Sequence, residues 1–150
     1  MHFTNDPAPA PDQRSEPASF TLPVRVYYED TDAGGVVYYA NYLKFCERAR
    51  TDWLRAIGFE QGRLTREQNI VFVVRAVQAD YRQPAVLDDL LDVVTTIGRL
   101  GHASLIFDQK ILRGGQPVFD AQITIACIDA AARRAIPIPP AVRAQFASLV

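Results

Sequence analysis

The stretch "ANYLKFCERARTDWLRAIGF" (residues 40–59) decides the fold, because its helical periodicity is the clearest in the chain. Apolar residues recur at intervals of three and four and form one stripe: Tyr42, Phe45, Cys46, Ala49, Trp53 and Ile57. Charged residues are assigned to the other side: Lys44, Glu47, Arg48, Arg50, Asp52 and Arg55. Asn41 is predicted to cap the start of this helix, and Gly58 is predicted to end it.

Two segments of different character precede the helix. Residues 1–19 hold four of the ten prolines and almost no large apolar side chain. Such a composition does not bury enough surface to offset the entropy of ordering, so we expect a disordered tail before a folded domain over residues 20–150. The next segment, "FTLPVRVYY" (20–28), predicts a strand, and Pro23 favours an edge or a strand beginning there.

The chain beyond the helix is predicted to be mostly strand. Four segments are separated by short turns: 69–81, 89–100, 102–112 and 116–129. The last two alternate, so that each has an apolar face: Ala103, Leu105, Phe107, Gln109 and Ile111 on one, and Phe119, Ala121, Ile123, Ile125 and Cys127 on the other. Gly114-Gly115 suits a tight hairpin. "IPIPPAV" (136–142) ends the sheet and leads toward a short C-terminal helix.

This order of elements predicts the fold class. One strand, one long helix and then several strands joined by short turns indicate an α+β fold. We expect a curved antiparallel sheet of about five strands that wraps around one long central helix. A single helix leaves the edge strands and the outer face of the sheet without cover, so a homo-oligomer is expected.

Length and composition exclude several classes of protein. The 150 residues suffice for one domain, and a net charge of -1 argues against nucleic acid and anionic membranes as partners. No apolar run reaches the roughly 18 residues of a membrane span, and the N-terminus is unlike a secretory signal. Cys46 and Cys127 lie far apart in unlike surroundings, which favours core thiols in a reducing cytoplasm.

Familiar catalytic combinations are also missing. A catalytic triad needs a histidine, and His102 is the only candidate outside the tail; it is expected in an exposed turn. The sequence has no metal-ligand spacing, and "DAGG" (32–35) does not match a phosphate-binding loop. We therefore expect neither a metal nor a cofactor.

The stretch "YYEDTDAGGVVYYANY" (27–42) combines three acids, Glu29, Asp30 and Asp32, with a glycine turn and the helix start. Helix N-termini present free amides that can stabilise an oxyanion on a carbonyl. A nearby carboxylate, ionised at neutral pH, can attack that carbonyl or activate a water molecule. The alternative is that the aspartates only accept turn and cap hydrogen bonds.

The segment "RVYYEDTDAGGVVYYANYLKFCERARTDWL" (25–54) resembles the active-site region of the 4-hydroxybenzoyl-CoA thioesterase family of hotdog-fold enzymes. Within this family the match is closest to the acyl-CoA thioesterases associated with the Tol–Pal system. The similarity extends through "DYRQPAVLDDLLDV" (80–93), "ASLIFDQKILR" (103–113) and "IACIDAAARRAIPIP" (125–139). It therefore covers roughly residues 22 to 140.

The resemblance implies specific site residues. The family's catalytic carboxylate falls on Asp32, directly after Thr31. Members of the Tol–Pal type usually carry histidine where this chain has Tyr39, whereas hydroxybenzoyl-type members can carry tyrosine there; Tyr39 is expected to bind or position the substrate. Arg99 is the preferred residue for the nucleotide phosphates, ahead of the other basic candidates: His102, Lys110, Arg113, Arg133 and Arg134.

The resemblance also implies activity and assembly. Family members use coenzyme A thioesters at subunit interfaces and form dimers that often pair again into homotetramers. The expected function is hydrolysis of an acyl-CoA or acyl-carrier-protein thioester by Asp32, acting as nucleophile or general base. The alternative is a non-catalytic acyl-thioester-binding or assembly protein on the same scaffold. A hotdog dehydratase is disfavoured, because those enzymes typically use a histidine–acid pair.

Overall fold

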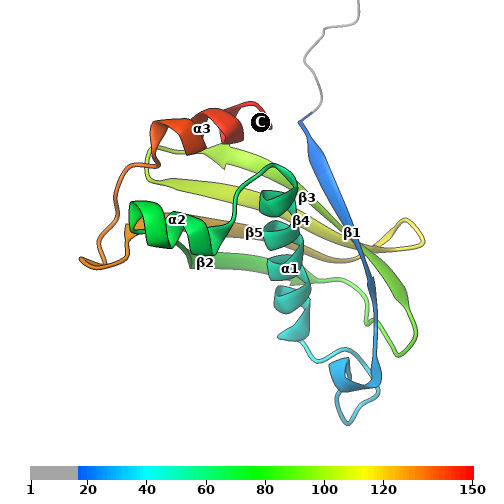
Figure 1. The fold of residues 1–150 in the computed structure, drawn as a ribbon. Coiled ribbons are helices and arrows are strands. Elements are labelled where there is room, and N and C mark those ends of the chain that lie inside the picture. Colours follow the sequence, from blue (N-terminus) through cyan, green and yellow to red (C-terminus); the bar gives the residue numbers. More distant parts are fainter. Residues whose placement is uncertain (1–16) are drawn as a thin grey trace, which may run out of the picture.

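The computed structural model describes residues 17–150. Its elements, in chain order, are β1 (Ser19–Arg25), the 3-10 helix η1 (Tyr28–Asp30), α1 (Asn41–Ala56), α2 (Gln61–Gln68), β2 (Ile70–Tyr81), β3 (Leu90–Leu100), β4 (Ser104–Arg113), β5 (Gln116–Asp129) and α3 (Pro140–Ala147). Figure 1 shows α1 lying against one face of the sheet. Most of the predicted tail, residues 1–16, lies outside the described residues.

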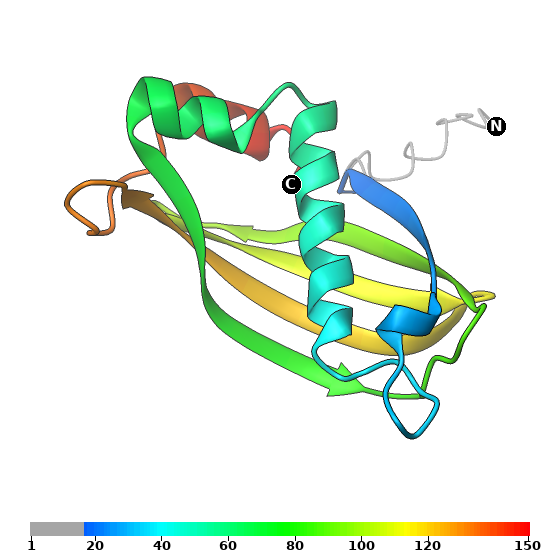
Figure 2. The same cartoon turned by 60° about the horizontal axis from the view of Figure 1, so that its bottom comes forward.

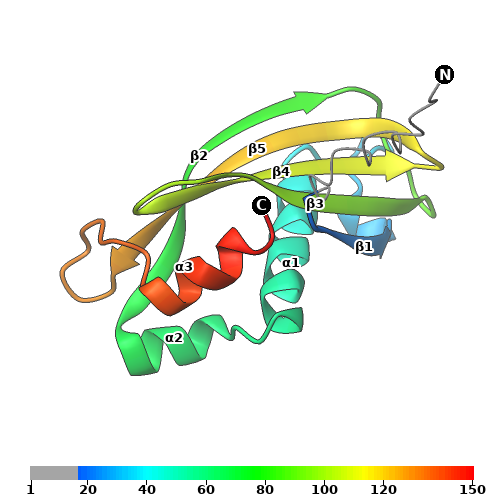
Figure 3. The same cartoon turned by 90° about the horizontal axis from the view of Figure 1, so that it is seen from above.

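The five strands form a single antiparallel sheet in the order β1-β3-β4-β5-β2. The two strands that flank α1 in sequence, β1 and β2, are therefore the two edges, and α1 spans the sheet between them. Figure 3, seen from above, shows the sheet curving around α1, with α2 and α3 together at one end. The predicted α+β architecture of five strands around one central helix is confirmed.

The core lies between α1 and the concave face of the sheet. The predicted stripe of α1 is buried from Tyr42 to Trp53. The predicted inward faces of β4 and β5 are buried as well, namely Leu105, Phe107, Gln109 and Ile111 on β4 and Phe119, Ala121, Ile123, Ile125 and Cys127 on β5. Trp53 stacks on Phe20 of β1 with ring centroids 6.3 Å apart and meets Phe107 of β4 edge to face. Burial of each large apolar side chain contributes about 1.5–3 kcal/mol, so this seam is the main attachment of the helix to the sheet.

Several predicted boundaries are wrong. The strand predicted over 20–28 begins at Ser19 and ends at Arg25. It ends early because the carboxylate of Asp30 accepts a hydrogen bond from the Tyr27 amide (2.8 Å), which turns the chain into η1. The strand predicted from residue 102 begins at Ser104, since the Gly101 amide donates to the Ser104 carbonyl and makes a turn first.

The helix α2 falls in a region that was expected to be mostly strand. It carries no apolar stripe, and Leu64 is its only buried residue, so periodicity gave no signal. The helix ends where Asn69 adopts a left-handed conformation, with φ of 56°. The C-terminal helix α3 is confirmed; Val142 and Phe146 attach it to the core.

Two predictions about α1 are corrected, and one is confirmed. Ala40 is the N-cap, whereas Asn41 is the first helical residue, and its side-chain amide donates to the Asp30 carbonyl (2.9 Å). Arg50, assigned to the solvent side, is buried. It lies four residues after Cys46 and three before Trp53, so it belongs to the inward stripe. Gly58 follows the helix end with φ of 95°, as predicted for a terminating glycine.

Candidate active site

The loop between β1 and α1, residues 26–40, carries the predicted catalytic acid. Figure 2 shows this loop at the end of the molecule away from α2 and α3. The loop doubles back on itself, because the Asp32 amide donates to the Val36 carbonyl (2.9 Å) and Thr31 bridges to Val37. The Val37 amide then donates to the Ala85 carbonyl (2.8 Å), which ties the loop to the segment before β3.

Asp32 lies at the tip of this hairpin with its side chain exposed. Its Oδ1 accepts a hydrogen bond from the Gly34 amide (2.8 Å), and its carbonyl accepts one from the Gly35 amide (3.0 Å). Gly35 has φ of 78°, a conformation that favours glycine. A Cβ on Gly34 would lie 3.2 Å from Oδ1, so glycine permits this close approach. Within residues 17–150, Oδ2 has no hydrogen-bond partner.

The three acids of the opening motif therefore differ in what they do. Asp30 caps the Tyr27 amide, the structural role that the alternative interpretation proposed. Glu29 is exposed and accepts no hydrogen bond from the described part of the chain. Asp32 has one oxygen in a turn hydrogen bond, as the structural interpretation predicts, and one oxygen without a partner among the described residues, as the catalytic interpretation requires. Its charge also reaches Tyr38, whose pKa is raised first by Tyr39 and, to a smaller degree, by burial and by Asp32.

Tyr39 lies just before α1 and is held from β2. Its carbonyl accepts a hydrogen bond from the Tyr81 hydroxyl (2.7 Å), and the two rings meet edge to face. Tyr81 packs in turn against Tyr42 and Phe119, with ring centroids 5.5 and 5.1 Å away. The Tyr39 side chain itself is 62% exposed, so it is not a core aromatic. Tyr81 was not singled out from the sequence, where it is only the last residue of a strand.

Some amides at the start of α1 are occupied. Asn41 donates to the Tyr38 carbonyl (2.8 Å), and Leu43 donates to the Ala40 carbonyl (3.2 Å). The amides of Tyr39 and Tyr42 have no acceptor in the part of the chain that the structure describes. No acceptor of the described chain therefore uses them, and the positive end of the helix dipole favours an anionic group at this position.

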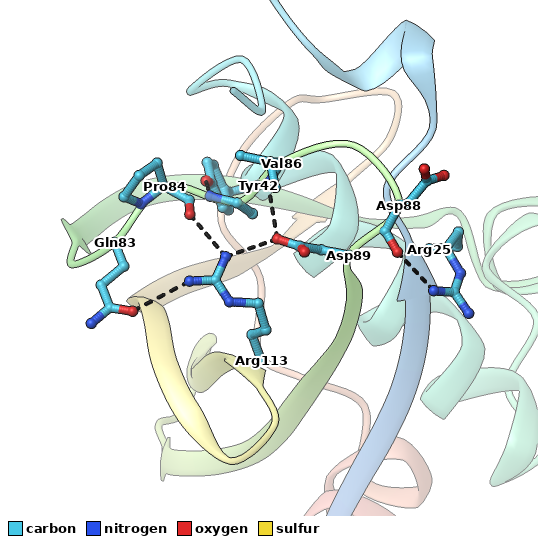
Figure 4. A network of polar contacts seen from close by, with 9 residues as sticks. Arg25, Tyr42, Gln83, Pro84, Val86, Asp88, Asp89 and Arg113 are labelled. Atoms are coloured by element: carbon cyan, nitrogen blue, oxygen red, sulfur yellow. Dashed lines mark hydrogen bonds and ion pairs between the residues drawn. The ribbon is translucent and has the colours of Figure 1, made fainter. Parts of the chain in front are cut away.

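A polar network supports the loop from behind (Figure 4). Arg113 of β4 donates to Oδ2 of Asp89 (2.8 Å) and to the Pro84 carbonyl (3.0 Å), and the Val86 amide donates to the same Oδ2 (2.9 Å). Partial burial raises the pKa of Asp89, but the hydrogen bonds from Val86 and Arg113 and the charge of Arg113 outweigh it and bring the pKa below its ordinary value. The network thereby shapes the segment that binds the Asp32 hairpin.

Arg99 does not lie near Asp32 within one chain. The strand β3 starts at Leu90, near the Asp32 loop, and reaches Arg99 at the opposite end of the sheet, about 30 Å away at 3.3 Å per residue. There Arg99 lines an open groove of about 400 Å³ together with Arg75, His102 and Thr124. Arg113, a lesser basic candidate, is at the Asp32 end and belongs to the Asp89 network instead.

Among the further hollows beside α1, two are lined by acids of the opening motif or by Arg50. An open groove of about 570 Å³ between β1 and α1 includes Glu29 and Asp30 but not Asp32. A smaller cavity of about 120 Å³ lies between α1 and the sheet, and Arg50 lines it. Its apolar walls come from five elements: Leu54, Phe72, Leu105, Phe107, Ile125 and Phe146.

Residues 17–150 form neither a metal-binding cluster nor a membrane-spanning helix. The described residues contain no group of three or more His, Cys, Asp or Glu side chains placed to hold a metal ion. None of the helices formed by these residues has the length and apolar character that a membrane span requires.

Comparisons with known proteins agree with this arrangement. The sequence matches the thioesterase-like superfamily over residues 26–146. It is 46% identical over 127 residues to the acyl-CoA thioesterase YbgC of Haemophilus influenzae, covering 85% of this chain and 93% of that protein. It is 43% identical over 128 residues to the acyl-CoA thioester hydrolase YbgC of Escherichia coli, covering 85% and 95%.

A solved structure extends the comparison to three dimensions. A 1,4-dihydroxy-2-naphthoyl-CoA thioesterase from Synechocystis superposes with a TM-score of 0.81 at 26% identity, covering 88% of this chain and 98% of that one. These findings confirm the resemblance that was seen in the residues around Asp32. The chain therefore belongs to the thioesterase-like superfamily and has the hotdog fold.

Proposed function

We propose that this chain is an acyl-CoA thioesterase in which Asp32 is the catalytic carboxylate. The observation that carries the proposal is the free Oδ2 of Asp32 on a hydrogen-bonded glycine hairpin just before α1. The YbgC relatives, whose names state this activity, match the chain across the whole of that segment.

The proposed chemistry uses few groups. Asp32 either attacks the thioester carbonyl or removes a proton from a water molecule that attacks it. The free amides of Tyr39 and Tyr42 stabilise the oxyanion that develops on the carbonyl oxygen. The carbon–sulfur bond then breaks, and the thiol leaves as a thiolate that takes up a proton from solvent. When Asp32 is the nucleophile, this step leaves a mixed anhydride between Asp32 and the acyl group, which water hydrolyses to the free acid and the regenerated carboxylate. Because a thiol has a pKa of about 8.5, this leaving group needs no strong general acid.

We further propose that the site is completed by a second copy of the chain. The strand β2 is an edge of the sheet, and Val74, Val77 and Tyr81 on it are 50%, 43% and 49% exposed. Exposed apolar edges favour pairing with another strand. Antiparallel pairing of β2 with its copy brings Tyr81 beside the start of the partner's β2, at the end of the sheet that carries the partner's Arg99. A dimer of such dimers stays a prediction.

This pairing gives Arg99 and Tyr39 roles in one site. The basic groove with Arg75 and Arg99 suits the phosphates of coenzyme A, because Arg pairs well with phosphate oxygens. Tyr39, exposed beside Tyr81, lies where the thioester has to enter and is proposed to position it. We propose a cytoplasmic location; two free, buried cysteines are compatible with a reducing compartment.

The test is release of free thiol from a panel of short, aromatic and long-chain acyl-CoAs, with acyl-carrier-protein thioesters as a second panel. Asp32→Asn is expected to lower kcat by about 100-fold or more, the contribution of a positioned acid or base. Glu29→Gln is the matched control, since this exposed acid lies three residues away and is expected to keep full activity.

Two outcomes would count against the proposal. Undiminished turnover by Asp32→Asn removes Asp32 from the mechanism. Binding of acyl-CoA by the wild-type protein without hydrolysis across both panels favours the acyl-binding alternative. A single turnover in ¹⁸O-labelled water identifies a nucleophilic Asp32 if the product acid is unlabelled and Asp32 carries the label, because water has then opened a mixed anhydride at Cγ of Asp32.

A further inference from the structure

The cavity between α1 and the sheet contains a buried cation. Arg50 is 7% exposed, and its Nη1 donates to Oε1 of Gln109 (2.9 Å). A guanidinium has five N–H groups, and this hydrogen bond uses one of them. None of the described buried nitrogens lacks a partner, so the remaining N–H groups of Arg50 face accessible space, and the cavity is the space that Arg50 lines.

Arg50 forms no ion pair with any carboxylate of residues 17–150, since none lies within 4 Å of its guanidinium. Glu47, one turn earlier on α1, instead accepts a hydrogen bond from Thr51 (3.3 Å). Burial lowers the pKa of Arg50, and the charges of Cys46 and Glu47 oppose this only in part; a guanidinium stays charged in proteins. An unpaired buried charge is costly, which suggests that an anion joins it when a ligand is bound.

A purely structural role does not explain this charge. Gln109 already links the helix to the sheet, because its Nε2 donates to the Cys46 carbonyl and to the Thr95 hydroxyl, each at 2.9 Å. An uncharged side chain at position 50 would pack against the same apolar walls without the cost of desolvation. What Arg50 adds is a set of N–H donors in a cavity whose inner walls are apolar and whose other polar lining residues are Glu47, Thr51 and Gln61.

The cavity opens toward the proposed dimer seam. Exposed residues mark its opening, namely Glu47, Gln61 and Val74, and Val74 belongs to the edge strand β2. In the antiparallel pairing proposed above, this half of β2 lies against the partner's Tyr81. The cavity of one protomer therefore lies next to the Asp32 loop of the other, where the acyl group of a bound thioester has to go.

We propose that this cavity receives the far end of the acyl group and that Arg50 selects chains ending in a carboxylate, that is, coenzyme A thioesters of short dicarboxylic acids. This inference rests on the proposed thioesterase function. The Arg50 cavity has a volume of about 120 Å³. An apolar cavity of about 150 Å³ binds benzene, which has six carbon atoms, so the Arg50 cavity is expected to hold about four or five carbon atoms. Adipoyl-CoA fits this description, and hexanoyl-CoA is its match without the charge.

The experiment compares kcat/KM for adipoyl-CoA and hexanoyl-CoA in the wild type, in Arg50→Met and in Arg50→Lys. The wild type is expected to favour adipoyl-CoA. Arg50→Met is expected to lower the adipoyl-to-hexanoyl ratio of kcat/KM about 10-fold or more, because a charge-assisted hydrogen bond to the adipoyl carboxylate is lost. Hexanoyl-CoA is still hydrolysed by this variant. Arg50→Lys restores part of the preference. Arg55→Met, an exposed arginine on the same helix, is the control and leaves the ratio unchanged.

A wild type that does not favour adipoyl-CoA, or a ratio that changes less than threefold in Arg50→Met, overturns the proposal. If Arg50→Met does not fold, binding of free adipate and hexanoate to the wild-type protein decides instead: adipate has to bind more tightly. The same binding measurement separates this inference from the proposed function, because it does not depend on turnover. Absence of thiol release from every thioester would refute only the hydrolase activity.

Discussion

Replacing Arg113 by Met tests whether the network behind the Asp32 loop stabilises the protein. The change removes three hydrogen bonds of Arg113, to the Asp89 carboxylate, to the Pro84 carbonyl and, at the longer distance of 3.4 Å, to the Gln83 side chain. Hydrogen bonds that involve a charged group contribute about 1.5–3 kcal/mol each. Because the Arg113 side chain is 35% exposed, solvent screening reduces this, and we expect a loss of about 2 kcal/mol in the free energy of unfolding at pH 7.

The loss of stability caused by Arg113→Met is expected to be larger at neutral pH than at acid pH. The pKa of Asp89 is lowered in the folded protein, so its contribution is present above the unfolded value near 3.9 and is lost as the pH falls through the folded value. Arg113→Met brings that pKa back toward its ordinary range. The difference in stability between wild type and variant is therefore largest near neutral pH and shrinks as the pH approaches 3.

The assay is urea unfolding at pH 7 and at several values down to pH 3. The control is Arg63→Met, which breaks an ion pair with Glu67 between side chains that are 65% and 57% exposed and is expected to cost no more than about 1 kcal/mol. A variant as stable as the wild type at pH 7, or a difference that grows toward acid pH, would refute the reasoning. The Arg113 variant is also expected to release thiol more slowly, because Ala85 and Val86 contact the Asp32 hairpin.

Three further changes test the core and the site. Trp53→Ala is expected to lower the free energy of unfolding by about 3–5 kcal/mol in urea titrations, and a loss below 1 kcal/mol would contradict its role as the helix anchor. Tyr81→Phe removes the hydrogen bond to the Tyr39 carbonyl and should lower kcat several-fold while the melting temperature changes little; unchanged kcat would show that this bond does not position the site. Burial raises the pKa of Cys46 to about 12 and also raises that of Cys127, so mass spectrometry after iodoacetamide treatment at pH 8 should find both unmodified until urea unfolds the chain.

The success of the sequence predictions follows from how local the signals are. The central helix, the hairpin turn at Gly114-Gly115 and the four strands after the helix are predictable from the sequence, because each has its own periodicity or turn residues within a short window. The site acid was narrowed from three candidates to Asp32 by family resemblance. The structure then separated these acids physically, since Asp30 caps an amide and Asp32 keeps one free oxygen.

The misses have an equally physical cause. The helix α2 has one buried residue, so it is stabilised by its position between α1 and β2 rather than by a pattern of its own. Arg50 is assigned to the solvent side of the helix because it is charged, although its spacing from Cys46 and Trp53 places it on the apolar stripe. Its burial is explained by Gln109, 59 residues away, which offers its side-chain oxygen from β4.

The sequence by itself determined that one amphipathic helix is wrapped by an antiparallel sheet and that a carboxylate stands on a glycine turn before that helix. Only the tertiary structure decided what supports that turn, because Arg113 and Asp89 lie 24 residues apart and meet through the register of β3 and β4. It also decided that the Arg99 groove lies at the opposite end of the sheet from Asp32, and that Arg50 faces a cavity. Periodicity shows which side of an element is apolar, whereas the partners across that side depend on how the whole sheet curves around the helix.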